Sequence, residues 1–359
     1  MIGRYRLPIR GFGCLPARAR RAIGILGLAC ALSIGLCACG SSSTSSTASV
    51  PVRVVPTPLA HPTQATLILD FTPNAVHAGI YRALAAGYYK REGINLRVVE
   101  PTSTQDTLKL IDAGRAQFGL ADGSDVASLI AGGGDAQAVM ALVQQPLGGL
   151  IALASEHLRS PAGLAGKTVG ITGVPSDLAV LDTELRASGL NPSRVHIATV
   201  GFNGPQALLA GRISAFTGFI PDEGVTLGAS GHPVRAFGLA QYGGPAYPGL
   251  VAFTTRHEIA SNPQLVRDFV AATMHGYEDT LADPSRSLAE LEAANPTLAH
   301  ALTAASLKVY LPLFAAGHSV PFGTLQPANV AAMSKWMLGA GLIHSPISPA
   351  RYGTNAFLP

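Results

Sequence analysis

The feature that most constrains the fold is a regular alternation of strand and helix patterns along residues 65–255. Short apolar runs rich in β-branched side chains predict strands at 65–72, 95–101, 116–122 and 136–145. Amphipathic segments between them predict helices at 77–92 and 103–115, the second with Ser103 or Thr104 as N-cap. Because parallel strands need crossover connections of this kind, we expect an α/β protein with mostly parallel sheets flanked by helices.

The alternation continues in a second block of the sequence. Strands are predicted at 167–173, 195–202 and 215–220, with helices at 178–190 and 203–212. Pro175, followed by Ser176 and Asp177, marks the start of the first of these helices. After about residue 255 the pattern changes to long helices that continue towards Trp336. A chain of 359 residues is long enough for two lobes, each with its own core.

The first 38 residues are expected to be a signal peptide. They contain six Arg and no acid, followed by an apolar stretch at 22–38 that is short for a membrane span and ends in small residues. The sequence at 36–39 resembles a bacterial lipobox, which predicts cleavage before Cys39 and lipidation of that residue. The alternatives are a plain signal peptide or an uncleaved anchor. Residues 39–64, rich in Ser, Thr and Pro, predict a flexible tether behind the lipidated Cys.

Charge and cysteine usage exclude several classes of function. Without the six N-terminal Arg, 19 of the 25 basic residues remain against 21 acidic ones, so no basic excess is left for binding nucleic acid. All cysteines lie at or before the predicted lipidation site: Cys14, Cys30, Cys37 and Cys39. The globular part is therefore expected to lack disulfides, thiolate metal sites and a cysteine nucleophile.

Polar side chains gather where the first predicted strand meets the first predicted helix. Asp70 and Phe71 end the strand, and three residues then share one face of the helix by their spacing: Asn74, His77 and Tyr81. A strand that runs into a helix N-terminus is the ligand-facing edge of an α/β sheet. We therefore expect a binding site here. Considered one at a time, these residues have an equally good alternative role: Asn74 as a helix cap, His77 as a solvated residue and Tyr81 as a core residue.

The pattern D-F-T-P-N-x-x-H-x-G-x-Y at 70–81, followed by GYYKREGINLRVVEP at 87–101, resembles the start of substrate-binding proteins of ABC importers. The branch in question includes thiamine-pyrimidine-precursor and riboflavin carriers and fungal thiamine-pyrimidine synthases. The resemblance runs from about residue 66 to about 336 and implies a two-lobed periplasmic-binding-protein fold of type II. It assigns 65–155 plus 255–359 to lobe one and 156–254 to lobe two, with the ligand cleft between them and a hinge at the two chain crossings.

The resemblance also implies the setting in which the protein works. We expect a lipid-anchored, monomeric solute-binding protein on the outer face of the cytoplasmic membrane, which closes around its ligand and delivers it to permease and ATPase subunits. No cofactor or metal is expected. A structural or adhesive lipoprotein, which needs neither a cleft nor acids at strand ends, is the alternative class.

Candidate ligand-binding residues follow from the rule that ligands bind at the C-terminal ends of parallel strands and the N-termini of the following helices. They are Asp70, Phe71, Asn74, His77, Tyr81, Asp122, Ser124 and Gln144 from lobe one, and Pro175, Ser176, Phe202, Asn203, Phe219, Glu223 and Tyr247 from lobe two and the crossing. Asp177 is expected to be a helix cap that does not touch the ligand.

This set of residues favours a planar amino-heterocycle as the ligand. Carboxylates accept from amino and ring N–H groups, and aromatic side chains stack on ring faces, whereas sulfonate or nitrate sites need Arg, Lys or clustered N–H groups. By the resemblance, the heterocycle is a thiamine pyrimidine precursor, with riboflavin, sulfonate, nitrate or a taurine-like anion as alternatives. Glu223 falls where the pyrimidine carriers have a ligand-facing Glu. The chain departs from them just before it, with Phe219-Ile220-Pro221 in place of a Trp and Asn.

An enzyme of the fungal synthase type is the remaining alternative. Those relatives hold pyridoxal phosphate on a Lys and carry a cysteine-rich motif. The matching segments here are 119–123, without Lys, and 244–248, without Cys. A Schiff base needs an amine, so we expect a binding protein without catalytic residues.

Overall fold

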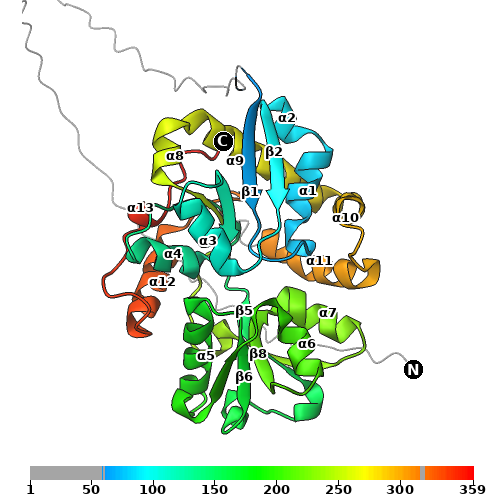
Figure 1. Cartoon of the computed structure of the whole chain (residues 1–359), viewed down its shortest axis with the longest axis vertical. Coiled ribbons are helices and arrows are strands. Elements are labelled where there is room, and N and C mark those ends of the chain that lie inside the picture. Colours follow the sequence, from blue (N-terminus) through cyan, green and yellow to red (C-terminus); the bar gives the residue numbers. More distant parts are fainter. Residues whose placement is uncertain (1–58, 60, 316–319) are drawn as a thin grey trace, which may run out of the picture. The chain divides into compact units, whose positions relative to one another are not determined.

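The computed structural model describes residues 59, 61–315 and 320–359, all of which belong to one compact unit at 54–359 (Figure 1). The predicted signal peptide, Cys39 and most of the predicted tether lie outside the described residues. The end of the tether needs correction, because its last two residues, 63–64, already belong to the first strand, Thr63–Ile68. Among the helices within the described ranges, none is both long and apolar enough to cross a membrane.

The first of two sheets has the strand order β2-β1-β3-β10-β4. These strands span Ile94–Val99, Thr63–Ile68, Phe118–Ala121, Leu250–Thr254 and Gln137–Val143, in that order. β1 pairs in parallel with β2 and β3, whereas β10 runs antiparallel to both β3 and β4. We call this sheet and the helices packed on it the first lobe.

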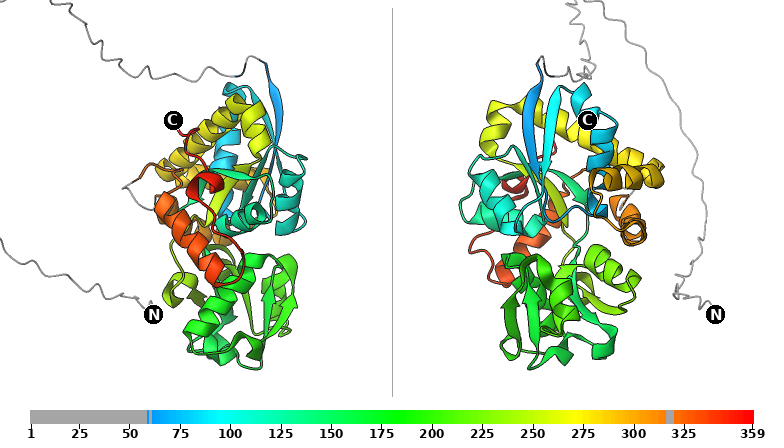
Figure 2. Two further views of the ribbon diagram at one scale, coloured as in Figure 1. Left: turned by 90° about the vertical axis from the view of Figure 1, so that its left-hand side faces the viewer. Right: turned by 45° about the vertical axis from the view of Figure 1, so that its right-hand side comes forward.

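Helices of the first lobe come from both ends of the described chain. They are α1 (Ala78–Ala85), α2 (Tyr88–Arg91), α3 (Thr104–Asp112), α4 (Gly123–Ala131), α8 (Arg256–Ser261), α9 (Pro263–Ala282), α10 (Pro284–Ala294), α11 (His300–Phe314), α12 (Pro327–Gly339) and α13 (Pro349–Tyr352). Figure 2 shows them on both sides of the sheet.

Alternating side chains at the end of β1 and just after it explain why both faces of the first sheet are covered. Leu67 and Leu69 belong to a core cluster that includes α1 and α9, whereas Ile68 belongs to another that includes α3, α4 and α12. Successive residues of a strand point to opposite faces, so the apolar run at 67–69 must be buried on both faces of the sheet. The strand predicted at 65–72 is confirmed, although β1 begins earlier, at Thr63, and ends at Ile68.

The second sheet has the order β7-β6-β8-β5-β9. Its strands span His196–Thr199, Thr168–Ile171, Ala215–Phe219, Gly148–Leu153 and Val234–Gly238, in that order. β6 is parallel to β7 and β8, and β5 is antiparallel to β8 and β9. With α5 (Pro175–Ala187), α6 (Gly204–Leu209) and α7 (Val225–Ala229), it forms the second lobe. Each sheet thus has one strand that runs against the other four, which confirms the mostly parallel α/β architecture.

The chain crosses between the lobes earlier than the sequence suggests. β5 at Gly148–Leu153 belongs to the second sheet and β10 at Leu250–Thr254 to the first. The crossings are therefore 144–147 and 243–249, and the expected boundaries at 155–156 and 254–255 need correction. The reason is topological: β4 passes straight into β5 without a crossover helix. A strand that starts at the edge where its neighbours end must run antiparallel to them.

The predicted helix at 77–92 is divided in the structure. A 3₁₀ turn at Ala75–His77 precedes α1, and Gly87, with φ 72°, separates α1 from α2. A positive φ is inexpensive only for glycine, so the chain turns at this residue. Ser103 caps α3 by accepting from the backbone N–H of Asp106, which confirms the first of the two predicted caps.

Close packing of α1 on α9 fixes the segment that carries the first candidate site residues. A Cβ at Gly79 would lie 2.4 Å from the ring of Tyr277, so only glycine allows the two helices to approach this closely. The Tyr277 hydroxyl donates to the carbonyl of Val76 at 2.8 Å and ties α9 to the 3₁₀ turn. The turn after β1 is therefore held by a buried, rigid partner.

Candidate functional site

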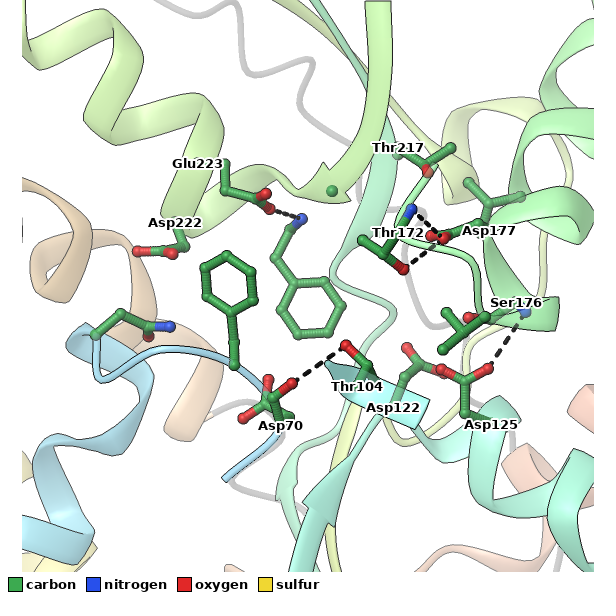
Figure 3. A pocket seen from close by; sticks show the side chains of 18 of the residues that line it. Asp70, Thr104, Asp122, Asp125, Thr172, Ser176, Asp177, Thr217, Asp222 and Glu223 are labelled. Atoms are coloured by element: carbon green, nitrogen blue, oxygen red, sulfur yellow. Dashed lines mark hydrogen bonds between the residues drawn. The ribbon is translucent and has the colours of Figure 1, made fainter. Parts of the chain in front are cut away.

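A cavity lies where the C-terminal ends of strands from both lobes meet (Figure 3). The space open to the centre of a water molecule is about 70 Å³, several times what a single buried water requires. Its lining residues are Asp70, Phe71, Asn74, Thr104, Asp122, Asp125, Gly148, Gly149, Thr172, Val174, Ser176, Asp177, Val180, Thr217, Gly218, Phe219, Asp222, Glu223 and Tyr247.

The first wall is built around Asp70, which follows β1. His77 is fully buried, and its Nε2 lies 2.8 Å from Asp70 Oδ1. His77 Nδ1 accepts the backbone N–H of Asn74 at 3.1 Å, so the ring proton must be on Nε2 and is donated to Asp70. Asn74 in turn accepts from the N–H of Val76 and caps the 3₁₀ turn. This chain of hydrogen bonds fixes the orientation of the Asp70 carboxyl group.

The opposite wall comes from the turn after β8, at Ile220–Gly224. Glu223 Oε2 accepts the backbone N–H of Phe219 at 2.7 Å. A Cβ at Gly218 would lie 2.4 Å from this oxygen, so glycine is needed for the carboxyl group to fold back onto the strand end. Burial, followed by the charge of Asp222, raises the pKa of Glu223 well above its usual value. Burial also raises the pKa of Asp222 to about 6.

A second group of acids surrounds the start of α4. Asp122 Oδ1 accepts from both the N–H and the hydroxyl of Ser124, at 2.7 and 2.6 Å, and Tyr247 approaches its Oδ2 at 3.4 Å. Gly123 allows this approach, because a Cβ there would lie 2.1 Å from the carbonyl oxygen of Pro248. Burial raises the pKa of Asp122 to about 7 despite these donors. The cap thus positions a carboxyl group at the cavity.

Asp125 and Asp177 complete this group from the two lobes. Asp125, on α4, accepts the backbone N–H of Ser176 on α5 at 3.2 Å. Asp177 accepts from the N–H groups of Thr172 and Gly173 and from the Thr172 hydroxyl, at 2.8, 3.1 and 2.6 Å. Burial is the main cause that raises the pKa of both acids, and for Asp125 the neighbouring charge of Asp122 adds to it.

The cavity is therefore lined by acids without a balancing cation. Six carboxyl groups face it, and none of the described lining residues is Lys, Arg or His. Within the described part of the chain, one carboxyl oxygen of each of four lining acids has no hydrogen-bond partner: Asp70 Oδ2, Asp125 Oδ2, Asp222 Oδ2 and Glu223 Oε1. Enclosed acceptors without donors are costly, so a ligand rich in N–H or O–H groups complements this wall.

Aromatic side chains form the remaining walls. Phe71 and Phe219 line the cavity, as does the ring of Tyr247, which stacks on Trp336 with centroids 5.6 Å apart. Phe202, from the second lobe, packs edge-to-face on Phe71 with centroids 4.4 Å apart. A flat ligand can therefore contact ring faces while the acids accept its hydrogens.

The two lobes contact each other around the cavity. Besides the Phe71–Phe202 pair, the side-chain amide of Gln105 donates to the carbonyl of Gly173. Ser306 on α11 donates to the carbonyl of Pro221 at 2.8 Å. Trp336 Nε1 on α12 donates to Thr183 on α5 at 2.9 Å. The structure is thus a closed arrangement of the lobes.

The structure brings many of the predicted site residues together. Those that line the cavity are Asp70, Phe71, Asn74, Asp122, Ser176, Phe219, Glu223 and Tyr247. Two others support lining residues from behind: Ser124 holds Asp122, and His77 holds Asp70. Phe202 reaches the site only through Phe71.

Other predicted site residues do not line the cavity. Tyr81 faces away from it, and its hydroxyl lies 3.4 Å from Asn295 Oδ1. Gln144 donates to the carbonyl of Thr324 at 2.7 Å. Pro175 and Asn203 are exposed near the starts of α5 and α6. Tyr81 shares a helix face with Asn74 and His77 in sequence, but the 3₁₀ turn changes the direction of that face.

Several lining residues are not among the predicted ligand contacts. They are Thr104, Asp125, Gly148, Gly149, Thr172, Val174, Asp177, Val180, Thr217, Gly218 and Asp222. Asp177 is predicted only to cap α5; it does accept backbone N–H groups, but it also lines the cavity. Asp125 is recognisable from its spacing, three residues after Asp122 on a helix N-terminus. Within residues 61–315 and 320–359, no group of three His, Cys, Asp or Glu side chains is arranged to hold a metal ion.

Several curated proteins are similar in sequence. A formylaminopyrimidine-binding protein of Halalkalibacterium halodurans is 29% identical over 286 residues, covering 78% of this chain and 86% of that protein. The riboflavin-binding protein RibY of Chloroflexus aurantiacus is 27% identical and covers 93% of this chain and 97% of its own. A 4-amino-5-hydroxymethyl-2-methylpyrimidine phosphate synthase of Legionella pneumophila is 28% identical, covering 70% of this chain and 80% of the synthase.

Solved structures share the fold. The alkanesulfonate-binding protein SsuA of Xanthomonas axonopodis pv. citri, bound to MOPS, matches with a TM-score of 0.64 and 18% identity, over 82% of this chain and 99% of that one. At this identity the match establishes the two-lobed α/β fold and nothing about the ligand. In sequence, a family model described as "NMT1/THI5 like" matches residues 74–287, more than half of the 359 residues and most of both lobes. The chain belongs to the NMT1/THI5-like family.

Proposed function

We propose that this protein is the solute-binding component of an ABC importer and that it carries a small planar amino-heterocycle, an aminopyrimidine of the thiamine-precursor class. The observation that carries this proposal is the acid-lined cavity with four carboxyl oxygens that lack partners among the described residues. Amino and ring N–H groups are the donors that such oxygens require. The similarity to a formylaminopyrimidine-binding protein over 78% of the chain supports the same class.

The lining chemistry argues against an anionic solute. A sulfonate, nitrate or phosphate needs positive charge or clustered N–H donors, and it would be repelled by ionised carboxyl groups nearby. The cavity presents six carboxyl groups, and none of its described lining residues is Lys or Arg. The sulfonate ligands of proteins with the same fold are therefore not proposed for this chain.

Riboflavin is the second candidate, because the relative named for it aligns over 93% of this chain. A flavin also has ring faces and N–H groups, so the aromatic walls suit both ligands. The space open to the centre of a water molecule, about 70 Å³, favours a single ring with small substituents over a tricyclic ring with a ribityl chain.

The chain is proposed to bind its ligand without transforming it. A synthase that consumes pyridoxal phosphate holds it as a Schiff base, which needs an amine. The segment that matches the reactive Lys is 119–123 and contains none. Asp122 and Ser124, at and just after this segment, form a helix cap.

The cellular setting is proposed from the sequence. The signal-peptide pattern and the lipobox at 36–39 support a lipoprotein attached through Cys39 to the outer face of the cytoplasmic membrane. The Ser/Thr/Pro-rich segment would let the lobes reach permease and ATPase partners while remaining near the membrane.

A ligand panel tests the proposal. Thermal unfolding would be followed with formylaminopyrimidine, 4-amino-5-hydroxymethyl-2-methylpyrimidine, riboflavin, an alkanesulfonate, taurine and nitrate. A ligand at 100 times its dissociation constant stabilises by ~2.7 kcal/mol, or roughly 5 °C for a chain of this size. We expect the pyrimidines to raise the melting temperature and the anions to leave it unchanged.

Two variants show whether the binding occurs in the cavity. Asp222→Asn changes a lining acid, and Asp182→Asn changes an acid of α5 that pairs with Arg186 away from the cavity. We expect the first to weaken pyrimidine binding and the second to leave it unchanged. Stabilisation by sulfonate or nitrate, with no response to any pyrimidine, would contradict the proposed function.

A further inference from the structure

We propose that the ligand carries a protonated amine, and that the carboxyl groups of Asp122, Asp125 and Asp177 bind it. The inference deepens the proposed function and rests on it: it divides the cavity into a ring-binding part and an ammonium-binding part. The ligand class is then a heterocycle with an aminoalkyl arm, rather than one with a hydroxyalkyl, formamido or phosphorylated arm.

The acids of the cavity fall into two groups. Figure 3 shows Asp222 and Glu223 on one side and the three acids Asp122, Asp125 and Asp177 on the other. The sixth acid, Asp70, goes with the first group, because its charge acts on both Asp222 and Glu223. The charges of Asp122 and Asp177 both act on Asp125, so the three acids lie within electrostatic reach of one another. A ring that donates to the first group therefore leaves the second group to be satisfied by another part of the ligand.

Neutral donors from the protein satisfy Asp177 but leave acceptor capacity on Asp125 and Asp122. Asp125 is 1% exposed and lines the cavity, and its Oδ2 has no hydrogen-bond partner among the described residues. The second oxygen of Asp122 has only the long 3.4 Å contact with the Tyr247 hydroxyl. Buried carboxyl groups this close repel one another when ionised, and a cation between them removes that cost.

An ammonium group suits this place better than other cations. It has three N–H donors, which matches a group of three neighbouring carboxyl groups, and it fits at the end of a short carbon arm. The ring of Tyr247, held in place by its stacking on Trp336, adds an aromatic face beside the same acids. Aromatic faces attract ammonium groups.

The three acids also come from both lobes. Asp122 and Asp125 belong to the start of α4 in the first lobe, and Asp177 belongs to the start of α5 in the second. An ammonium group between them attracts both lobes, alongside the hydrogen bond from Ser176 to Asp125. The amine thus contributes to closure as well as to affinity.

The test compares two probes that differ in one group. They are 4-amino-5-aminomethyl-2-methylpyrimidine, whose primary amine is protonated at pH 7, and its 5-hydroxymethyl counterpart, which is neutral there. Calorimetry on the full mature protein is expected to give at least tenfold tighter binding of the aminomethyl probe. Asp125→Asn keeps an oxygen to accept from Ser176 and removes the charge. The variant is expected to lower the affinity for the aminomethyl probe at least fivefold more than the affinity for the hydroxymethyl probe.

A control variant and the contrary outcomes complete the test. Asp182→Asn, on the same helix as Asp177 but paired with Arg186 outside the cavity, is expected to bind both probes like the wild type. Equal or tighter binding of the hydroxymethyl or formamido pyrimidine overturns the ammonium site while leaving the proposed function intact. The same conclusion follows if Asp125→Asn weakens both probes alike. Binding of riboflavin or a sulfonate with no response to any pyrimidine overturns both.

Discussion

Asp125 on α4 accepts a hydrogen bond from the backbone N–H of Ser176 on α5, at 3.2 Å, and so joins the two lobes directly at the cavity. Both residues are buried, so this contact forms only when the lobes are closed. The crossings at 144–147 and 243–249 are the segments about which the lobes can separate. Ligand binding and lobe closure are therefore expected to depend on the same residues.

Phe202→Ala tests closure without changing a cavity-lining residue. Phe202 packs edge-to-face on Phe71 across the lobes, and such pairs contribute about 0.5–1.5 kcal/mol. We expect ligand affinity to fall by roughly two- to tenfold, at about 1.4 kcal/mol per decade. Small-angle scattering is expected to show less compaction on adding ligand. Calorimetry on Ile197→Ala, an exposed residue of the same lobe, gives the control; equal affinities for both variants would contradict this role of the pair.

Glu223→Gln tests the acid at the opposite wall. The substitution keeps an oxygen that can accept the N–H of Phe219 and replaces the other carboxyl oxygen, which has no partner among the described residues, with an amide NH₂ group. Hydrogen bonds to charged groups contribute about 1.5–3 kcal/mol, so we expect affinity to fall roughly ten- to a hundredfold. Denaturant unfolding should give nearly the wild-type stability.

The same measurements on Asp70→Asn test the first wall of the cavity, where His77 fixes the orientation of the Asp70 carboxyl group. This variant is expected to lose affinity to a similar extent. Glu156→Gln, in a partly exposed ion pair with Lys167, is the matched control and should bind normally. If both cavity variants bind like the wild type, the cavity is not the ligand site.

The amino-acid sequence is sufficient to predict the two mostly parallel sheets and part of the site. Strand ends are recognisable from their apolar runs, so Asp70, Asp122 and Glu223 can be assigned to strand ends at the cleft from the sequence alone. β5 and β10, each of which follows a crossing between the lobes, cannot be assigned to their sheets in this way. A strand reached directly from the other lobe has no helix before it to mark the crossing. Local pattern identifies a strand but not the sheet to which it belongs.

Side-chain roles are harder to predict than positions. Asp177 has the sequence context of a helix cap and does accept N–H groups, yet it also lines the cavity, which only the tertiary arrangement reveals. Tyr81 has the correct helical spacing for a ligand contact, but the 3₁₀ turn at Ala75–His77 directs it towards Asn295 instead. A single turn of a different helix type is enough to invalidate a spacing argument.

Cys39→Ala tests the proposed membrane attachment. If Cys39 is the lipidated first residue of the mature protein, the variant should be released from the membrane or remain as unprocessed precursor. Metabolic labelling with a fatty-acid analogue, together with N-terminal sequencing of the wild type, measures this directly. Cys37→Ala is the control, since that position lies within the predicted signal peptide and is expected to allow processing. A mature N-terminus other than Cys39 would exclude lipidation at this residue.

Glu184 gives a prediction about stability and pH that is independent of the ligand. This fully buried residue of α5 accepts the N–H of Leu150, and burial raises its pKa to about 9, from 4.5. Above pH 4.5 the unfolded chain releases this proton while the folded chain keeps it, so rising pH favours unfolding up to about pH 9. We expect Glu184 to lower the free energy of unfolding by a few kcal/mol between about pH 5 and pH 8.

Urea unfolding of the wild type and Glu184→Gln at both pH values isolates this contribution. The uncharged amide has nearly the same shape and no proton to lose, so the variant should show a smaller decrease in stability from about pH 5 to pH 8 than the wild type. Any constant cost of placing the amide in the core cancels when the two pH values are compared. Glu258→Gln, at a partly exposed position on α8, should retain the wild-type pH dependence. If wild type and Glu184→Gln lose equal stability, Glu184 is ionised in the folded protein at about pH 8.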